Sequence, residues 1–172
     1  MRKGYIQVYT GNGKGKTTAA LGLAVRAAGA GLSVFIAQFI KRRQCSEHTA
    51  LEKFDDLIVV KQYGNGFLKG RQANDSDIDS ARKAIADVKE ALFCGKHGLV
   101  ILDEINIAIH YGLVNIDEIL DMMDSKPSDV EIVLTGRYAD RRIREKADLV
   151  TEMNCVKHYL EKGVRARPGI EY

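Results

Sequence analysis

The sequence predicts an α/β fold with a doubly wound, mostly parallel sheet and helices on both of its faces. Three observations support this prediction: short apolar runs rich in β-branched residues recur, helix-like segments separate them, and a glycine-rich loop follows the first run. Strands that alternate with helices favour a parallel sheet with right-handed crossovers. Strands that are apolar throughout are typical of a sheet covered on both sides.

The predicted strands are short and mostly apolar throughout, as expected for buried parallel strands. They cover residues 5–10, 33–39, 57–62, 99–103, 131–135 and 149–153. Two of the connections between them, residues 41–48 and 63–76, are predicted to be long loops. Because loops of this length in a compact domain are often functional, we expect both to lie near a binding site.

Four segments are predicted to be helical. Residues 17–28 are rich in alanine, so this helix should pack closely against the sheet. Within residues 77–95, apolar residues recur at steps of three and four and form one stripe. Asn115 precedes Glu118 by three residues, which is the spacing of a capping box at a helix start. The basic cluster Arg141, Arg142, Arg144 and Lys146 is expected to be a solvated helix face.

Composition limits the possible functions. The chain has 172 residues and a net charge of +3, so we expect one domain, residues 1–172, that can bind a small anionic ligand. The charge is too weak to favour nucleic acid, and no apolar run is long enough for a membrane span or a signal peptide. Three widely spaced cysteines without a CxxC pair indicate free thiols, which suits a cytoplasmic protein.

The strongest motif is the sequence TGNGKGKTT at residues 10–18, between the first predicted strand and the first predicted helix. Glycines let successive N–H groups point inward around phosphate oxygens, and the helix N-terminus adds its positive dipole end. Lys16 supplies a positive charge, and the hydroxyl of Thr17 can ligate Mg²⁺. Thr10 replaces the first glycine of the usual GxxxxGK[ST] pattern. The predicted nucleotide-binding residues are Gly11, Asn12, Gly13, Lys14, Gly15, Lys16, Thr17 and Thr18.

Acidic and basic residues follow two other predicted strands. Asp103 and Glu104 end the apolar segment 99–104, which resembles a Walker B element. Parallel strands end at the same edge of a sheet, so these carboxylates can approach a phosphate-bound metal. Arg137 follows the strand 131–135, and this motif alone does not decide between a phosphate contact and a surface ion pair.

Several motifs occur together in one order along nearly the whole chain and resemble the ATP:corrinoid adenosyltransferases of the P-loop type. They are TGNGKGKTT at 10–18, QFIK at 38–41, Gly66-Phe67, LDE at 102–104, TGR at 135–137, VKH at 156–158 and GIEY at 169–172. The resemblance implies a RecA-like fold, a homodimer, and transfer of the 5′-deoxyadenosyl group of ATP to a Co(I) corrinoid such as cobalamin, with release of triphosphate.

The resemblance also implies roles for individual residues. Residues 11–17 would hold the triphosphate, with Lys16 stabilising its charge as it leaves, and Thr17 and Glu104 would bind Mg²⁺. Arg137 stays a candidate for a contact with the nucleotide. Phe67 would pack beneath the corrin ring and displace its lower ligand, which makes reduction to Co(I) by an electron donor such as a flavoprotein easier. The chain departs from the family pattern at Lys69, where a tryptophan is expected, and in residues 42–47.

Two alternatives have a P-loop but a different function. A nucleoside kinase of the thymidine-kinase type also combines a P-loop with a strand-end Asp-Glu pair, but it usually carries a cysteine zinc site that three scattered cysteines cannot form. A RecA-like ATPase module that acts on DNA would require a basic groove with aromatic residues, and aromatic residues make up only 7% of this chain.

Overall fold

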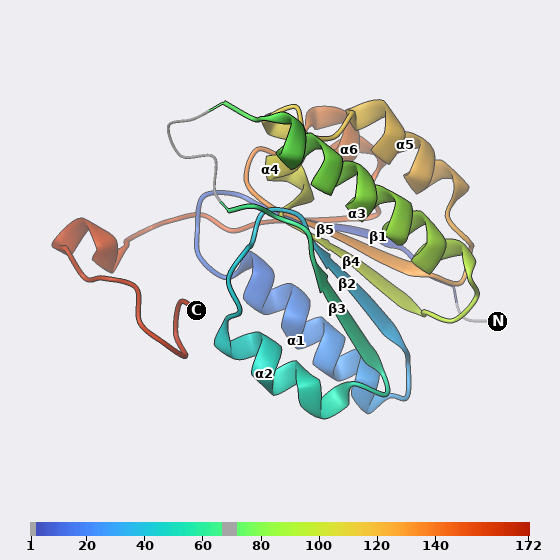
Figure 1. Cartoon of the computed structure of the whole chain (residues 1–172), viewed down its shortest axis with the longest axis horizontal. Helices are drawn as coiled ribbons and strands as arrows, with labels where there is room; N and C mark the ends of the chain where they lie inside the picture. The colour runs from blue at the N-terminus through green and yellow to red at the C-terminus, as the bar shows by residue number, and fades with distance from the viewer. Residues whose placement is uncertain (1–2, 67–71) are drawn as a thin grey trace.

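The chain forms one six-stranded sheet in which every pair of neighbouring strands is parallel. The computed structural model describes residues 3–66 and 72–172. The strands lie in the order β3-β2-β4-β5-β1-β6 (Figure 1). Their bounds are β1 Ile6–Thr10, β2 Val34–Gln38, β3 Ile58–Gln62, β4 Leu99–Asp103, β5 Glu131–Thr135 and β6 Leu149–Glu152. The predicted doubly wound α/β fold is therefore confirmed.

The strand order explains the composition of each strand. β2, β4 and β5 lie inside the sheet and are buried at all five positions, as their continuous apolar runs predict. β6 differs because it is an edge strand and is exposed at all four positions. The predicted strand bounds agree with the structure to within one residue at each end.

Helices cover both faces of the sheet (Figure 1). α1 and α2 pack on one face, and α3, α4, α5 and α6 pack on the other. Side chains alternate across each strand, so both faces contribute to a core: Ile36 faces the α1 side, whereas Phe35 and Ala37 face the α3 side. The helix bounds are α1 Lys16–Gly29, α2 Ser46–Leu51, α3 Asp75–Phe93, α4 Ile105–His110, α5 Ile116–Ser125 and α6 Arg141–Lys146.

Several helix predictions need correction. The segment 41–48 is not loop throughout, because α2 begins at Ser46. α3 begins at Asp75, two residues earlier than predicted, because Asn74 caps it and forms a capping box with Asp77. Asn115 does cap α5, but it accepts a hydrogen bond from the N–H of Asp117. The predicted partner of Asn115, Glu118, forms an ion pair with Lys89 instead.

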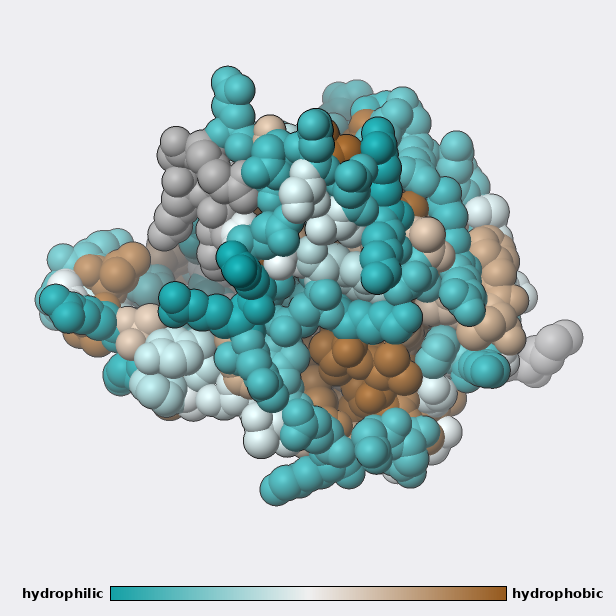
Figure 2. Space-filling view, viewed as in Figure 1, coloured by the Kyte–Doolittle hydropathy of each residue, from teal (hydrophilic) through white to brown (hydrophobic). Residues whose placement is uncertain are grey.

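The chain after β6 leaves the body of the protein and then returns to it. It forms the short 3₁₀ helix η2, Tyr159–Lys162, at the far end of this excursion (Figure 1). Figure 2 shows a mainly hydrophilic face with a hydrophobic area over the edge strand β3, where Val59 is exposed. No helix within the described part of the chain is long and apolar enough to span a bilayer.

Candidate active site

The glycine-rich loop lies between β1 and α1, and its backbone packs against the chain that follows β6. A Cβ atom on Gly11 would lie 2.4 Å from the carbonyl oxygen of Met153, and one on Gly13 would lie 2.7 Å from the same atom. Gly11 also has φ +92°, a conformation that side chains rarely adopt. The loop therefore requires glycine at both positions, because the backbone of the chain that follows β6 packs directly against it.

Thr10 occupies the position of the first glycine in the usual P-loop pattern without strain. It is the last residue of β1 and pairs with Glu152 of β6. Its hydroxyl oxygen accepts a hydrogen bond of 3.4 Å from the N–H of Ala139. Thr10 therefore connects the loop to the segment that follows β5.

Lys16 is buried at the first position of α1, and its ammonium group binds the loop itself. Nζ donates hydrogen bonds to the carbonyl oxygens of Gly11 at 2.8 Å and Gly13 at 2.7 Å. Burial lowers the pKa of Lys16 below its ordinary value. A phosphate oxygen is a stronger acceptor for this ammonium than a neutral carbonyl, so a triphosphate in the loop can take over these hydrogen bonds.

Asp103, at the end of β4, is surrounded by hydrogen-bond donors. Its Oδ1 accepts hydrogen bonds of 2.8 Å from the hydroxyls of both Thr17 and Thr135. Its Oδ2 accepts a hydrogen bond of 3.1 Å from the amide of Gln38 and lies 3.6 Å from Nζ of Lys41. The carboxylate is fully buried and satisfied, so it holds α1, β2 and β5 in position around the end of β4.

Glu104 has the opposite environment although it follows Asp103 directly. Among the described residues, none donates a hydrogen bond to its buried Oε2 atom. Burial, and then the neighbouring Asp103 carboxylate, raise the pKa of Glu104 to about 6. A half-buried carboxylate with a buried oxygen that lacks a donor is stabilised by a cation, so this group fits a metal ion.

The backbone around Glu104 fixes the direction of its side chain. Glu104 has φ 64°, in the left-handed region, and its N–H donates a hydrogen bond of 2.9 Å to the hydroxyl of Thr135. Gly136, which has φ +128°, lies beside it: a Cβ on Gly136 would lie 3.1 Å from Oε2 of Glu104. Glycine at this position therefore leaves space next to the carboxylate.

Lys16, Thr17 and Glu104 line one cavity of about 920 Å³, whereas Gly11 and Asp103 lie outside its lining. Its lining includes the loop from Asn12 to Thr18, with Glu104 and Arg137 from the ends of β4 and β5. The structure thus brings together most of the residues predicted from the sequence, and Arg137 is exposed at the cavity wall. Phe67 and Lys69 lie outside the described residues.

The cavity also contains residues to which the motifs assigned no role. Lys41 and Glu47 form an ion pair of 3.0 Å in its wall. Tyr111, Tyr138 and residues 169–172 also line it, and the ring of Tyr138 stacks on His110 with centroids 4.3 Å apart. The family resemblance is the signal that could have identified some of these residues. Its motifs include Gln38, Lys41 and residues 169–172.

The site contains the oxygen ligands that a magnesium ion prefers. The Glu104 carboxylate has no donor among the described residues, and the Thr17 hydroxyl oxygen keeps its lone pairs when its hydrogen points to Asp103. A magnesium ion bound by these two groups would neutralise charge on phosphate oxygens and polarise them.

Comparison with solved structures agrees with the fold. A KaiC-like protein, PH0186, from Pyrococcus horikoshii has a TM-score of 0.59 at 19% identity, over 91% of this chain and 75% of that one. The RadB recombinase has a TM-score of 0.57 at 15% identity, over 91% of this chain and 77% of that one. At this level of identity, the likeness shows a RecA-like fold and no more.

Comparison of sequences identifies the family. The chain is 36% identical to a corrinoid adenosyltransferase of Pseudomonas aeruginosa over 99% of this chain and 84% of that protein. It is 36% identical to one of Escherichia coli K12, over 99% of this chain and 86% of that protein. The profile of the family described as "ATP:corrinoid adenosyltransferase BtuR/CobO/CobP" matches residues 2–172. The chain therefore belongs to the ATP:corrinoid adenosyltransferase family.

Proposed function

We propose that this protein transfers the 5′-deoxyadenosyl group of ATP to the Co(I) centre of cobalamin or another corrinoid. The cobalt supplies the electron pair of the new cobalt–carbon bond, and the bond between C5′ and its phosphate oxygen breaks. The triphosphate leaves with that electron pair. The observation that carries the proposal is that a phosphate-binding loop and an unpaired carboxylate, Glu104, line the same cavity in a chain that belongs to this family.

The residues of the cavity match what this reaction requires. Negative charge builds up on the triphosphate as it leaves, and Lys16 with the N–H groups of residues 11–17 would stabilise it. Thr17 and Glu104 would hold Mg²⁺, and Arg137 would contact the nucleotide from the cavity wall. Because Co(I) is already a strong nucleophile, the protein needs to orient C5′ toward it and exclude water rather than supply a general base.

The finer partners of the reaction are also part of the proposal. An electron donor such as a flavoprotein would reduce the corrinoid to Co(I), and Phe67 would assist by displacing the lower ligand of the cobalt. The proposed setting is the cytoplasm, because the cysteines Cys45, Cys94 and Cys155 are free thiols.

The protein is proposed to act as a homodimer. Apolar side chains on the excursion after β6 support this proposal, since Val156 is 96% exposed and Leu160 is 66% exposed. Light scattering on the purified protein would give its mass in solution and test this point directly.

The products test the reaction itself. We would incubate the protein with ATP, Mg²⁺ and chemically reduced cobalamin, and follow the phosphates by ³¹P NMR. The expected result is triphosphate in proportion to a light-sensitive cobalt–carbon product, with little ADP. ADP as the main product, formed equally without corrinoid, would favour a kinase or an ATPase and contradict the proposal.

A further inference from the structure

The end of the chain lies against the phosphate-binding loop. Nζ of Lys14 donates a hydrogen bond of 3.0 Å to the carbonyl oxygen of Ile170 and lies 3.3 Å from Oε1 of Glu171. The Lys14 side chain is thus directed toward residues 169–172, which also line the nucleotide cavity. Residues 167–172 are called the returning segment below.

Glu171 fastens the returning segment to the rest of the C-terminal region. Its Oε2 accepts hydrogen bonds from the backbone N–H of Arg167 at 2.8 Å and from Nε of Arg167 at 3.3 Å. The hydroxyl of Tyr159 donates to its Oε1. Hydrogen bonds from Arg167 and Tyr159 keep the pKa of Glu171 well below its ordinary value, so the carboxylate is charged at neutral pH.

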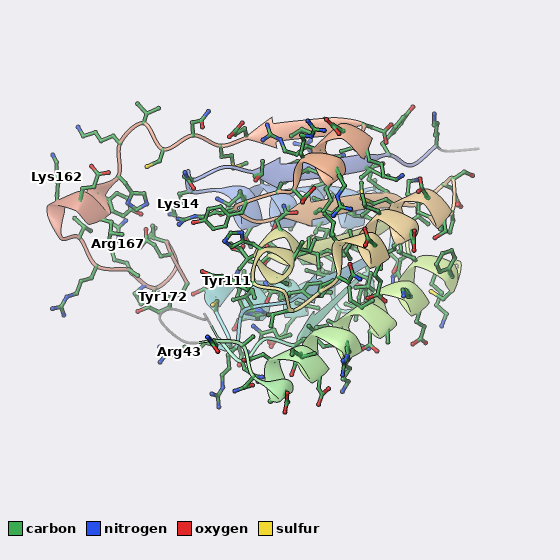
Figure 3. All side chains as sticks on the ribbon, turned by 90° about the horizontal axis from the view of Figure 1, so that it is seen from above. Lys14, Arg43, Tyr111, Lys162, Arg167 and Tyr172 are labelled. Atoms are coloured by element: carbon green, nitrogen blue, oxygen red, sulfur yellow. The ribbon has the colours of Figure 1, made fainter. Side chains whose placement is uncertain are left out.

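A second contact ties the returning segment to the opposite side of the cavity. The hydroxyl of Ser46, at the start of α2, donates a hydrogen bond of 3.0 Å to the main-chain oxygen of Tyr172. Figure 3 shows Lys14, Tyr111 and Tyr172 around the same space, whereas Lys162 lies at the far tip of the excursion. The returning segment therefore bridges the phosphate-binding loop and α2.

We propose that residues 169–172 form a wall of the nucleotide pocket, and that Glu171 is the positioning residue that holds this wall against Lys14. The proposal rests on the ATP-binding function proposed above. A wall that is already in place reduces the entropy lost when the nucleotide binds and keeps water from the reacting atoms. Glu171 contributes through Lys14 and the returning segment, without contacting the reacting atoms itself.

Two variants remove the two anchors separately. Glu171→Gln removes the charged contact to Lys14, and Ser46→Ala removes the contact to α2. Isothermal titration calorimetry with MgATP, in the absence of corrinoid, measures binding independently of adenosyl transfer. We expect Glu171→Gln to raise the dissociation constant about five-fold or more, because it weakens several charge-assisted hydrogen bonds at once. Ser46→Ala should change it in the same direction but less, because it removes a single hydrogen bond whereas Glu171→Gln weakens several.

Controls separate this role from a merely structural one. Glu161→Gln alters an exposed carboxylate of η2 and should leave MgATP binding unchanged. The melting temperature of the nucleotide-free Glu171→Gln protein should stay close to that of the wild type. Lys14→Met combined with Glu171→Gln should cost no more affinity than the stronger single change, because the two residues act as a pair.

Three results would contradict these expectations. Unchanged MgATP affinity in Glu171→Gln would show that Glu171 does not hold residues 169–172 as a wall of the pocket. Tighter binding would also overturn it, since Glu171 would then compete with phosphate for Lys14. A wild-type protein that binds no MgATP would instead contradict the proposed function, which keeps the two failures distinguishable.

Discussion

The hydroxyl of Thr17 donates a hydrogen bond of 2.8 Å to Oδ1 of Asp103, which joins the start of α1 to the end of β4. Because Asp103 is fully buried and also receives donors from Thr135 and Gln38, it serves to orient the other groups of the site. Glu104, the next residue, has no donor to Oε2 within the described residues and is the carboxylate available to a metal ion.

Replacement of Asp103 by asparagine should therefore destabilise the protein. The amide offers only one acceptor oxygen, so its NH₂ group must face either the two threonine hydroxyls or the donors Gln38 and Lys41. We expect the free energy of unfolding to fall by about 1–3 kcal/mol, the cost of a buried polar group without a partner. Urea denaturation would measure it.

The matched control for this change is Asp79→Asn. The Asp79 side chain is 72% exposed and pairs with Arg82 within α3. Its replacement should cost less than about 1 kcal/mol, as for other exposed ion pairs. Equal losses of unfolding free energy in the two variants would show that the hydrogen bonds to Asp103 stabilise the protein no more than an exposed ion pair does.

Lys16→Ala should weaken MgATP binding without loss of the fold. A charge-assisted contact to the triphosphate is worth about 1.5–3 kcal/mol, so the dissociation constant should rise roughly 10- to 150-fold. Calorimetry would measure the affinity, and Lys89→Ala on α3 provides a control with a half-exposed lysine. If Lys16→Ala bound MgATP as the wild type does, the phosphates would not occupy this loop.

Local patterns were sufficient to predict the sheet and the phosphate-binding loop. The internal strands β2, β4 and β5 are mostly apolar and are buried at every position, and the glycines at Gly11 and Gly13 mark a backbone that allows no side chain. α2 and α4 were not predicted, because neither of these six-residue segments shows a clear helical period.

The different roles of Asp103 and Glu104 could not be predicted from the sequence. Asp103 receives its donors from three other elements, and Gln38 reaches it only because β2 lies beside β4 in the sheet. Strand order and hydrogen-bond direction are properties of the folded chain. The contact of Lys14 with Glu171, 157 residues away, depends on the fold in the same way.

The stability of the nucleotide-free protein should depend on pH through Glu104. Folding raises the pKa of Glu104 from its ordinary value of 4.5 to about 6, so the folded state binds the proton more tightly than the unfolded state. The stability that this tighter proton binding adds is present below pH 4.5 and is lost as the pH rises to about 6. At pH 7.5 the free energy of unfolding of the wild type should therefore be about 2 kcal/mol lower than that of the neutral variant Glu104→Gln.

Chemical denaturation at a series of pH values would test this dependence. Glu104→Gln should be more stable than the wild type at pH 7.5, and the difference should vanish near pH 4. Glu145→Gln, in which the original side chain is 60% exposed, should show no such trend. A stability difference between Glu104→Gln and the wild type that does not change with pH would contradict a half-buried, unpaired carboxylate at this position.

Phe67 should matter only when the enzyme must help to make Co(I). It follows Gly66 in the segment between β3 and α3, where the family resemblance places a ring beneath the corrin, and it lies outside the described residues. Displacement of the lower ligand makes reduction of Co(II) easier, but it contributes nothing once Co(I) has been formed. Phe67→Ala should therefore slow adenosylcobalamin formation from cob(II)alamin with a weak reductant by about ten-fold or more, which corresponds to about 1.4 kcal/mol.

The same variant should react nearly normally with cob(I)alamin that has been prepared in advance. Lys69→Trp, which restores the ring that the family pattern has at this position, should accelerate only the reaction from cob(II)alamin. Phe93→Ala removes a ring that is 54% exposed at the end of α3 and should affect neither rate. Equal losses from the two starting states in Phe67→Ala would make Phe67 a packing residue, because a residue that only supports the fold cannot distinguish the oxidation state of the cobalt.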